Sequence, residues 1–543
     1  MKLHHIGTLL TMVLLFGCSR SSGLLSPSME RDMQYFPFGH QELFGPSTMG
    51  QSEFTPHFND VDLGQIRGVA NQAEIVSIAG HGCAAVTLYR PYDDDVDYFD
   101  MKFKPIFRWL DASLPDINGD PRWVTNFDFV QICNGIDYRG LSCAAIYDDG
   151  QGSIVINDAP STPAIELAVA YQYREPLDPG PGFGQWKIGL TRLLWYGNDL
   201  TYFWLKQPTV RKDYNDLDLH TGTIPNTKAD IGEIAPDIAY NCENGDIYMV
   251  FVNLNSATIA RVNYRKYRRG SNSFGSEYFS QTQDHNGWDP SVDVGLVSVI
   301  PPPAPPLNCV AVTYTSQYQG GHMGYHVCAA GWDTGQIDMD QYSISIMNPL
   351  PPYEFKDAGL SQVDIAPKAN SLHFATCTYT QVTGDDWYGP ITGVAVVNYF
   401  GYISGHLVLD ISDAPPDDPE HPLYRADSLY SSIAINNSTV SPIFASISCL
   451  GQEPESETLH PVWAKVRLDP GHLSVDSFDW VDTILPIVSG NYNISDIPYQ
   501  NPGVASAIVL WGANQMYWAA WADRIEMEPP PQAIYGAYGW AGN

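Results

Sequence analysis

Short apolar segments recur along the chain and are separated by polar turns rich in glycine, proline, aspartate and asparagine. Seven segments begin alike, with an acidic or hydroxyl residue followed by small or apolar ones, as in Asp237-Ile238-Ala239. These starts are Ser77, Asp128, Asp237, Asp293, Asp364, Ser432 and Asp496. Runs of this length, rich in β-branched and small residues, predict strands rather than helices.

A second apolar strand is expected after each start, at residues 83–88, 143–147, 247–252, 309–314, 374–379, 444–449 and 506–510. A third usually follows, as at 257–264 and 391–399, so each module is an antiparallel sheet of three or four strands. One such sheet cannot bury both of its faces, whereas radial stacking buries them and leaves only short edges. The pattern therefore predicts an all-β chain folded as a β-propeller.

The number of blades follows from the spacing of the starts. Most starts lie 51 to 71 residues apart, but 109 residues separate Asp128 from Asp237. That gap has room for a further module around Glu166-Leu167-Ala168, so seven or eight blades are expected. We place the propeller at residues 71–525. Before it, residues 18–70 comprise the lipidated cysteine and either a tether or an irregular N-terminal segment, and after it residues 526–543 form either an irregular tail or a segment that packs on the first blade to close the ring.

The best-formed module resembles the blades of bacterial sialidase-like propellers. It comprises Pro236 to Tyr240, Gly245 to Val252, and Ala257 to Val262. The resemblance lies in strand spacing and extends over residues 74–525. Because no module carries the Ser-x-Asp-x-Gly-x-Thr-Trp motif typical of sialidases, the resemblance implies the fold and not sialidase activity.

The N-terminus has the pattern of an export signal. An apolar run from Ile6 to Phe16 is too short to span a bilayer and ends in Leu15-Phe16-Gly17-Cys18. This ending resembles the lipobox of bacterial lipoproteins, which implies removal of residues 1–17 and lipid on Cys18. We therefore expect a lipid-anchored, extracytoplasmic protein of the cell envelope, at the outer membrane if the organism has one.

Charge excludes one class of partner. The chain has 28 Lys and Arg against 61 Asp and Glu, for a formal charge of −33. A nucleic-acid partner bound through a generally basic surface is therefore not expected.

The cysteines leave two interpretations open. Eight remain besides Cys18, an even number that permits disulfides in an exported protein. Cys133–Cys143 and Cys309–Cys328 are the candidate bridges. However, Cys83, Cys143 and Cys309 begin closely similar segments, which points equally to buried packing positions.

Candidate chemistry is confined to a few turns. Asp116, Asn118 and Asp120 alternate as calcium ligands do, and they fit either a calcium turn or an ordinary aspartate-rich loop. Pro121 excludes EF-hand geometry, because an EF-hand needs glycine there. Apart from Ca²⁺ at this turn, no cofactor is expected. The recurring acidic starts, such as Asp237, fit either a cation-binding ring or braces for backbone amides of neighbouring blades.

Aromatic side chains next to acids form the other candidate site. The aromatic residues are Tyr92, Tyr98, Trp387 and Tyr388, and the acids of this candidate site are Asp385 and Asp386. Flat rings beside carboxylates suit sugar binding, although aromatic residues also fill blade cores.

Three functions remain open on the sequence. The first is a lipid-anchored propeller that binds a protein partner or glycan through its loop face. The second is an extracytoplasmic glycoside hydrolase or polysaccharide lyase, and the third is a structural surface or assembly lipoprotein. Enzymatic activity is left undecided because no catalytic motif is present, and binding is favoured.

Overall fold

A computed structural model describes the strands of the chain and some of the turns between them. The described residues are 55–56, 68–78, 82–91, 104–111, 122–124, 137–151, 162–174, 186–200, 203, 206, 208–214, 232–256, 259–271, 273–275, 278–279, 285–297, 307–318, 324–332, 344–346, 355–364, 373–383, 391–398, 403–409, 428–435, 444–452, 459–469, 472–480, 504–511, 514–522 and 534–540. Side chains are described chiefly between Leu141 and Tyr314.

The described strands form seven antiparallel sheets, numbered here in chain order. Sheet 1 is β2 (Gly68–Ile78), β3 (Gly82–Pro91), β4 (Lys104–Asp111) and β5 (Arg122–Val124). Sheet 2 is β6 (Asp137–Asp148), β7 (Ala164–Arg174), β8 (Lys187–Tyr196) and β9 (Thr209–Tyr214). Sheet 3 is β10 (Gly232–Tyr240), β11 (Ile247–Ser256), β12 (Ile259–Arg268), β13 (Ser273–Phe274) and β14 (Tyr278–Phe279), with the 3₁₀ turn η4 (Arg269–Ser271) after β12.

The other four sheets repeat this order. Sheet 4 is β15 (His285–Val297), β16 (Leu307–Tyr318), β17 (Gly324–Trp332) and β18 (Ile344–Ile346). Sheet 5 is β19 (Phe355–Asp364), β20 (His373–Thr383), β21 (Ile391–Asn398) and β22 (Ile403–Leu409). Sheet 6 is β23 (Ser428–Ile435), β24 (Phe444–Gln452), β25 (Leu459–Asp469) and β26 (His472–Trp480). Sheet 7 is β27 (Val504–Trp511), β28 (Asn514–Ala522), β29 (Ile534–Trp540) and β1 (Thr55–Pro56).

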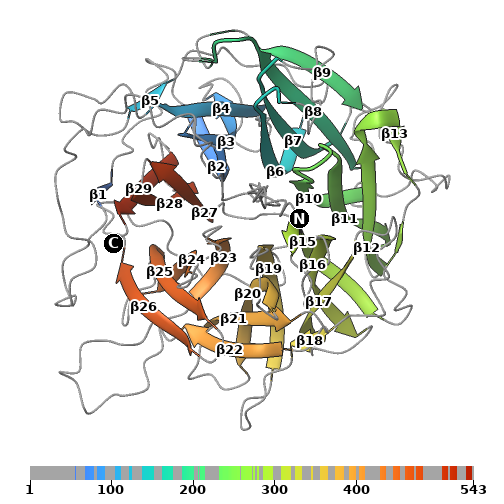
Figure 1. Cartoon of the computed structure of the whole chain (residues 1–543). Coiled ribbons are helices and arrows are strands. Elements are labelled where there is room, and N and C mark those ends of the chain that lie inside the picture. Colours follow the sequence, from blue (N-terminus) through green and yellow to red (C-terminus); the bar gives the residue numbers. More distant parts are fainter. Residues whose placement is uncertain are drawn as a thin grey trace, which may run out of the picture.

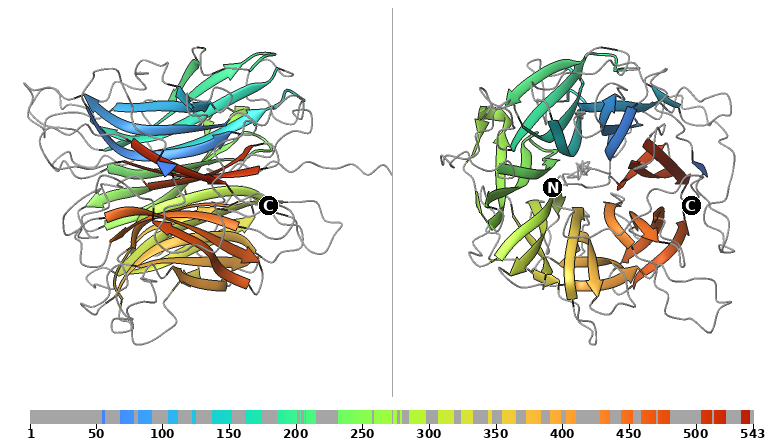
Figure 2. Two further views of the ribbon diagram at one scale, coloured as in Figure 1. Left: turned by 90° about the vertical axis from the view of Figure 1, so that its left-hand side faces the viewer. Right: turned by 180° about the vertical axis from the view of Figure 1, so that it is seen from behind.

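The sheets stand around a common centre, each with its first strand innermost (Figure 1). Each first strand contacts the first strand of the next sheet in chain order. Figure 2 shows the same arrangement from the side and from behind. The predicted all-β chain of radially arranged antiparallel sheets is confirmed in this arrangement.

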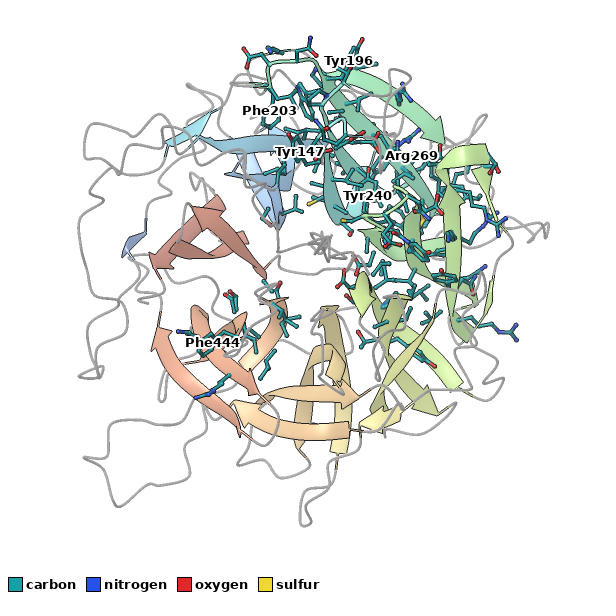
Figure 3. The ribbon with its side chains drawn as sticks, in the orientation of Figure 1. Tyr147, Tyr196, Phe203, Tyr240, Arg269 and Phe444 are labelled. Atoms are coloured by element: carbon teal, nitrogen blue, oxygen red, sulfur yellow. The ribbon has the colours of Figure 1, made fainter. Side chains whose placement is uncertain are left out.

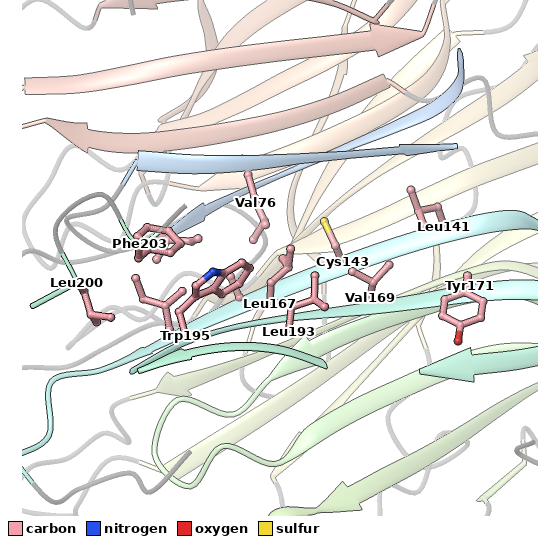
Figure 4. Close-up of a cluster of buried hydrophobic side chains, with 14 of the residues drawn as sticks. Val76, Leu141, Cys143, Leu167, Val169, Tyr171, Leu193, Trp195, Leu200 and Phe203 are labelled. Carbon is pink, nitrogen blue, oxygen red and sulfur yellow. The ribbon is translucent and has the colours of Figure 1, made fainter. Parts of the chain in front are cut away.

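Apolar side chains fill the spaces between adjacent sheets. Strand β7 shows how, because its odd-numbered residues Ile165, Leu167 and Val169 pack with Val76 of sheet 1 (Figure 4). Its even-numbered residues Ala168 and Ala170 pack instead against sheet 3. Both faces of the strand are buried, which explains its nearly continuous apolar sequence.

An irregular register recurs in the innermost strands. The pairing with the second strand shifts in β2, β6, β10, β15, β19 and β23. In β6 the shift falls at Gly140, whose φ is +49°, and in β10 it includes Ala235, whose φ is +50°. A Cβ on Gly140 would lie 2.9 Å from Gln172 Oε1 and 3.3 Å from Pro236, so the β6 and β10 bulges lie against each other.

The structure corrects the expected strand assignment in two modules. Residues 143–147 and 506–510 lie in the first strands β6 and β27, not in second strands. Glu166-Leu167-Ala168 belongs to β7, the second strand of sheet 2, and not to a separate module. The wide gap before Asp237 therefore contains no additional described sheet. Asp128 and Asp496 lie outside the described residues.

The two terminal segments also differ from expectation. Strand β29 falls within residues 526–543, which were expected to be irregular. Strand β1 falls within the expected tether at 18–70 and pairs with β29, Thr55 opposite Tyr538. Residues far apart in the sequence thus share one sheet.

Both proposed cysteine bridges are wrong. Cys143 is a buried thiol, as is Cys449. In sheet 4, Cys328 lies opposite Thr313, four residues along β16 from Cys309. That offset is about 13 Å along a strand, whereas a disulfide needs Cα atoms within about 7 Å. Cys242 is disulfide-bonded.

Candidate functional site

The sequence-predicted site residues all lie outside the described residues. These are Cys18, Tyr92, Tyr98, Asp116, Asn118, Asp120, Asp385, Asp386, Trp387 and Tyr388. Within the described residues, no group of three or more His, Cys, Asp and Glu side chains is placed to hold a metal ion. No helix in that part of the chain is long and apolar enough to cross a membrane.

The described strands nevertheless show which strands the segments with these residues connect. Tyr92 and Tyr98 fall between β3 and β4, and Asp385 to Tyr388 fall between β20 and β21. Both segments join a second strand to a third. Asp116 to Asp120 fall between β4 and β5, a third strand and a fourth, so they enter at the opposite end of their sheet.

The first strands run in the same direction where their side chains are described. Gly140 of β6 lies against Pro236 of β10, and two residues further along β6 Ser142 contacts Asp237. Because residue order is the same on both strands, equivalent connections of these sheets emerge at the same end. We call the end with the second-to-third and fourth-to-first connections the entry end, and the other the hairpin end.

A buried charged cluster joins sheets 2 and 3 near the hairpin end. Glu166 of β7 points toward sheet 3 because it is one of the even-numbered residues of that strand. Its side chain is 0% exposed. Tyr240, at the end of β10, donates a hydrogen bond to Glu166 Oε1 at 2.6 Å. Figure 3 shows Tyr240 and Arg269 on neighbouring parts of sheet 3.

Two arginine guanidinium groups lie next to the Glu166 carboxylate and compensate its negative charge. Arg269 donates from Nη2 to Oε1 and from Nη1 to Oε2, the latter at 3.2 Å, a bidentate pair. Arg192 Nη1 lies 3.7 Å from Oε1 and its Nη2 donates to the hydroxyl of Tyr267 at 3.1 Å. The cluster is therefore built from both sheets and spans their interface.

The protonation of the cluster follows from its charges. Burial alone would raise the pKa of Glu166, but attraction to Arg269 and then Arg192 outweighs it, and the pKa falls below its usual value. Burial and the negative charge of Glu166 raise the pKa of Tyr240 well above 10. Glu166 is thus a carboxylate and Tyr240 a neutral donor, so neither can exchange a proton near neutral pH.

The β10–β11 hairpin holds the outer arginine in place. Arg269 Nε donates to the carbonyl of Gly245 at 2.9 Å, and its backbone N–H donates to Asp246 Oδ1 at 2.9 Å. Lys266 Nζ lies 3.2 Å from Asp246 Oδ2. Arg269, Asp246 and Lys266 are thereby engaged with one another, and the cluster is a structural link between sheets 2 and 3.

Asp237 joins three consecutive sheets. Its Oδ1 accepts from Ser142 Oγ of sheet 2 at 2.6 Å and from the N–H of Ile238 at 2.8 Å. Its Oδ2 accepts from the N–H of Val292 in sheet 4 at 2.9 Å. For this residue the structure favours the bracing of backbone amides over a cation site.

The recurring acidic start is not one structural position. Asp237 is the first residue paired after the bulge of β10, whereas Ser291 takes that place in β15. Asp293 lies two residues further on and pairs with Ala311. The two aspartates are thus alike in residue type but stand two positions apart relative to the equivalent one-residue bulges of their strands.

Glu166, Arg192 and Arg269 were missed as a group by sequence reasoning. Their separations are 26 and 77 residues, and no motif links them. The one available signal was Glu166 itself, a charged residue within the apolar run Ala164 to Tyr171. A charge in such a run requires a buried partner.

Comparisons with known proteins assign no family. No family model and no curated protein matches the chain. Among solved structures, an alpha-L-arabinofuranosidase of Fusarium graminearum complexed with arabinobiose has 9% identity and a TM-score of 0.36, covering 74% of this chain and 92% of its own.

Two further solved structures have similar values. An alpha-L-arabinanase of Penicillium chrysogenum has 8% identity and a TM-score of 0.33, covering 74% of this chain and 93% of its own. A neuraminidase-like protein of A/flat-faced bat/Peru has 8% identity and a TM-score of 0.31, covering 91% and 96%. At such scores the likeness bears on neither activity nor ligand, and the fold rests on the strand topology.

Proposed function

We propose that this chain is a seven-bladed β-propeller of the cell envelope, held by lipid on Cys18, that binds a carbohydrate at the entry end of its ring. Seven sheets with adjacent first strands support the blade number, and pairing of β1 with β29 supports closure of the ring. The disulfide at Cys242 supports an oxidising compartment outside the cytoplasm.

We choose the entry end as the binding face because the longest connections between strands belong to it. The three longest connections, 481–503, 410–427 and 215–231, each join a fourth strand to the next first strand. Both aromatic and acidic segments, 92–103 and 384–390, enter there as well. Long loops on a rigid scaffold are the usual place for binding residues. The buried charged cluster near the hairpin end, by contrast, is engaged within the fold.

A second candidate is hydrolysis of a glycosidic bond at the same end. It is favoured by the carboxylates of the same two segments, Asp93 to Asp95, Asp97, Asp100, Asp385 and Asp386. Glycoside hydrolysis requires two carboxyl groups, about 5 Å apart in retaining enzymes and about 6.5–9.5 Å apart in inverting ones. Turnover distinguishes this candidate from binding alone.

The test is calorimetric titration of the purified chain with neutral oligosaccharides, together with chromatography of any products. Replacement of Trp387 and Tyr388 by alanine is expected to weaken binding at least about tenfold, or ~1.4 kcal/mol, because a flat ring no longer covers the sugar face. Tyr196→Ala is the matched control, since Tyr196 is 56% exposed and ends a third strand at the hairpin end (Figure 3).

Three outcomes decide between the candidates. Binding without products excludes hydrolysis and retains the proposal. Products that disappear with Asp385→Asn or Asp386→Asn establish hydrolysis in its place. Absence of binding to every oligosaccharide tested contradicts a carbohydrate site at the entry end. So does a loss of affinity in Tyr196→Ala equal to that caused by replacing Trp387 and Tyr388.

A further inference from the structure

The turn between β10 and β11 contains an asparagine followed by a glycine. Asn244 is exposed, and Gly245 is buried with a φ of +71°. Asparagine loses its side-chain amide most readily before glycine, because glycine has no side chain to hinder attack by its own backbone nitrogen. This turn therefore holds a dipeptide that is prone to spontaneous deamidation.

The geometry of the turn requires both residues. The left-handed φ of Gly245 disfavours any residue with a Cβ, and a Cβ there would lie 2.5 Å from Arg269 Nε. Asn244 Oδ1 accepts a hydrogen bond from the N–H of Asp246 at 2.9 Å, a bond to the residue two positions on that asparagine readily forms. The reactive dipeptide is thus present because the turn depends on it.

Deamidation at this position has two steps. The backbone nitrogen of Gly245 gives its proton to a solvent base and attacks Cγ of Asn244. A new C–N bond closes a five-membered succinimide, and the side-chain nitrogen takes up a proton and leaves as ammonia. Water then opens the ring at either carbonyl, which gives aspartate or isoaspartate. In isoaspartate the main chain passes through the side-chain carbon, so the backbone is one atom longer.

The closed turn holds both reacting groups out of position for this attack. The N–H of Gly245 donates to the carbonyl of Asn241 at 2.8 Å, so the attacking nitrogen keeps its proton and is directed toward Asn241. The bond from Asp246 fixes the side-chain amide of Asn244. A further bond, from the N–H of Asn241 to the carbonyl of Asp246 at 2.8 Å, closes the turn. Attack therefore requires the turn to open.

Arg269 connects the turn to the buried cluster. Its Nε donates to the carbonyl of Gly245 at 2.9 Å, and its backbone N–H donates to Asp246 Oδ1 at 2.9 Å. The same guanidinium forms the bidentate pair with Glu166 of sheet 2. An additional backbone atom at position 244 would displace the Gly245 carbonyl from Arg269 Nε. Opening of the turn and the link between sheets 2 and 3 are therefore coupled through one side chain.

We propose that Asn244 is a deamidation site which the closed β10–β11 turn protects, and that its conversion to isoaspartate weakens the link between sheets 2 and 3. The proposal does not depend on what the entry end binds. It requires only the hydrogen bonds of the turn and the contacts of Arg269.

Protection is measured by mass spectrometry of the peptide that contains Asn244, after incubation of the purified chain at mildly alkaline pH. Deamidation of Asn244 is expected to be at least about tenfold slower in the folded chain than in the same chain unfolded in urea, because attack needs local opening. Equal rates in the two states would exclude protection by the turn and overturn the proposal.

Coupling is measured in Arg269→Lys, which keeps a positive charge next to Glu166 but has no Nε donor for the Gly245 carbonyl. Deamidation of Asn244 is expected to be at least about threefold faster in this variant, because one hydrogen bond of the turn is lost. Arg268→Lys, at the exposed neighbouring position, is the matched control. Asn286-Gly287 is the same dipeptide in β15, paired with Gln317 and Ser316, and its rate should not change. An unchanged rate at Asn244, or an equal increase at Asn244 and Asn286, would exclude coupling.

The consequence of the modification is measured on the separated isoaspartate form. This form is expected to unfold at a lower urea concentration than Asn244→Asp, which keeps the backbone length and an oxygen for the N–H of Asp246. Equal unfolding midpoints would overturn the proposed weakening of the link. Should Arg269→Lys not fold, this comparison and the rates in folded and unfolded wild type decide the matter.

Discussion

At the scale of single residues, one buried carboxylate adds a charged link to the apolar packing between sheets 2 and 3. Glu166 is fully buried and is compensated by two guanidinium groups and a phenol contributed by both sheets. Burial of a charge is costly, and attraction within the cluster offsets that cost only while every partner is present. Removal of one member of the cluster is therefore expected to cost more stability than the energy of its individual contacts, because a buried charge is left without compensation.

Glu166→Gln is expected to lower the free energy of unfolding by about 3–5 kcal/mol, because Arg192 and Arg269 would remain buried without a counter-charge. Urea unfolding followed by tryptophan fluorescence measures the change. Glu243→Gln, an exposed glutamate in the neighbouring hairpin, is the control and is expected to change stability by less than about 0.5 kcal/mol. A loss below 1 kcal/mol in Glu166→Gln would contradict the compensated cluster.

The same carboxylate predicts a dependence on pH. The pKa of Glu166 is lowered in the folded chain, so its contribution to stability is complete above the ordinary glutamate value of about 4.3. That contribution is lost as pH falls through the lowered pKa. The difference in unfolding free energy between wild type and Glu166→Gln should be constant from pH 5 to 7 and should shrink below about pH 4. Unfolding curves at each pH measure it, and a difference that grows on acidification would refute the assignment.

At the scale of elements, the first strands are joined through their bulges. Each bulge shifts the pairing, and in β10 it brings Asp237 to a point where β6 and β15 are both within hydrogen-bond distance. Gln172 of β7 supports the same bulge of β10 by accepting from the N–H of Ala235 at 3.1 Å. The inner wall of these three sheets is thus fixed by side chains that bridge strands not paired with each other.

Asp237→Asn is expected to destabilise the chain by about 2–3 kcal/mol, because one carboxylate oxygen and the charge that strengthens its bonds are replaced by an amide that repels a donor. Ser142→Ala removes a single partner and should cost about 1 kcal/mol. Thermal unfolding measures both. Asp149→Asn, in an exposed turn where Asp149 accepts from Gln151, is the control. Equal effects of Asp237→Asn and Asp149→Asn would show that Asp237 does not link the sheets.

At the scale of the whole molecule, the last sheet is completed by the start of the chain. Strand β1 pairs with β29, so one sheet contains residues from both ends of the sequence. This pairing covers part of the outer edge of β29, at Ala537 and Tyr538, and joins distant segments by strand pairing as well as by packing.

A chain that begins at residue 60 lacks β1 and is expected to lose about 1–3 kcal/mol of stability, corresponding to the hydrogen bonds of two paired residues. Exposure of the β29 edge should also promote aggregation. A chain that begins at residue 48 retains β1 and is the control. Thermal unfolding and light scattering measure the two effects, and identical behaviour of both truncated chains would argue against a stabilising role for β1.

The sequence by itself predicted the class of fold and much of the strand order. Alternation of short apolar segments and turns predicts antiparallel strands, since strand formation depends mainly on local composition and spacing. The pattern failed at residues 143–147, where a first strand has the same small, apolar sequence as a second strand because both of its faces are buried. The candidate binding residues, among them Trp387 and Tyr388, remain predictions, because they lie outside the described residues.

Only the tertiary structure decided which residues meet. Glu166, Arg192 and Arg269 are brought together from two strands and a 3₁₀ turn, and Asp237 contacts Ser142 across 95 residues of sequence. Each bulge shifts the register by one residue, which no local pattern records, and pairing of β1 with β29 joins segments near opposite ends of the sequence. The physical reason is that local sequence determines strand propensity and which face is apolar, whereas partners across an interface depend on the packing of whole sheets.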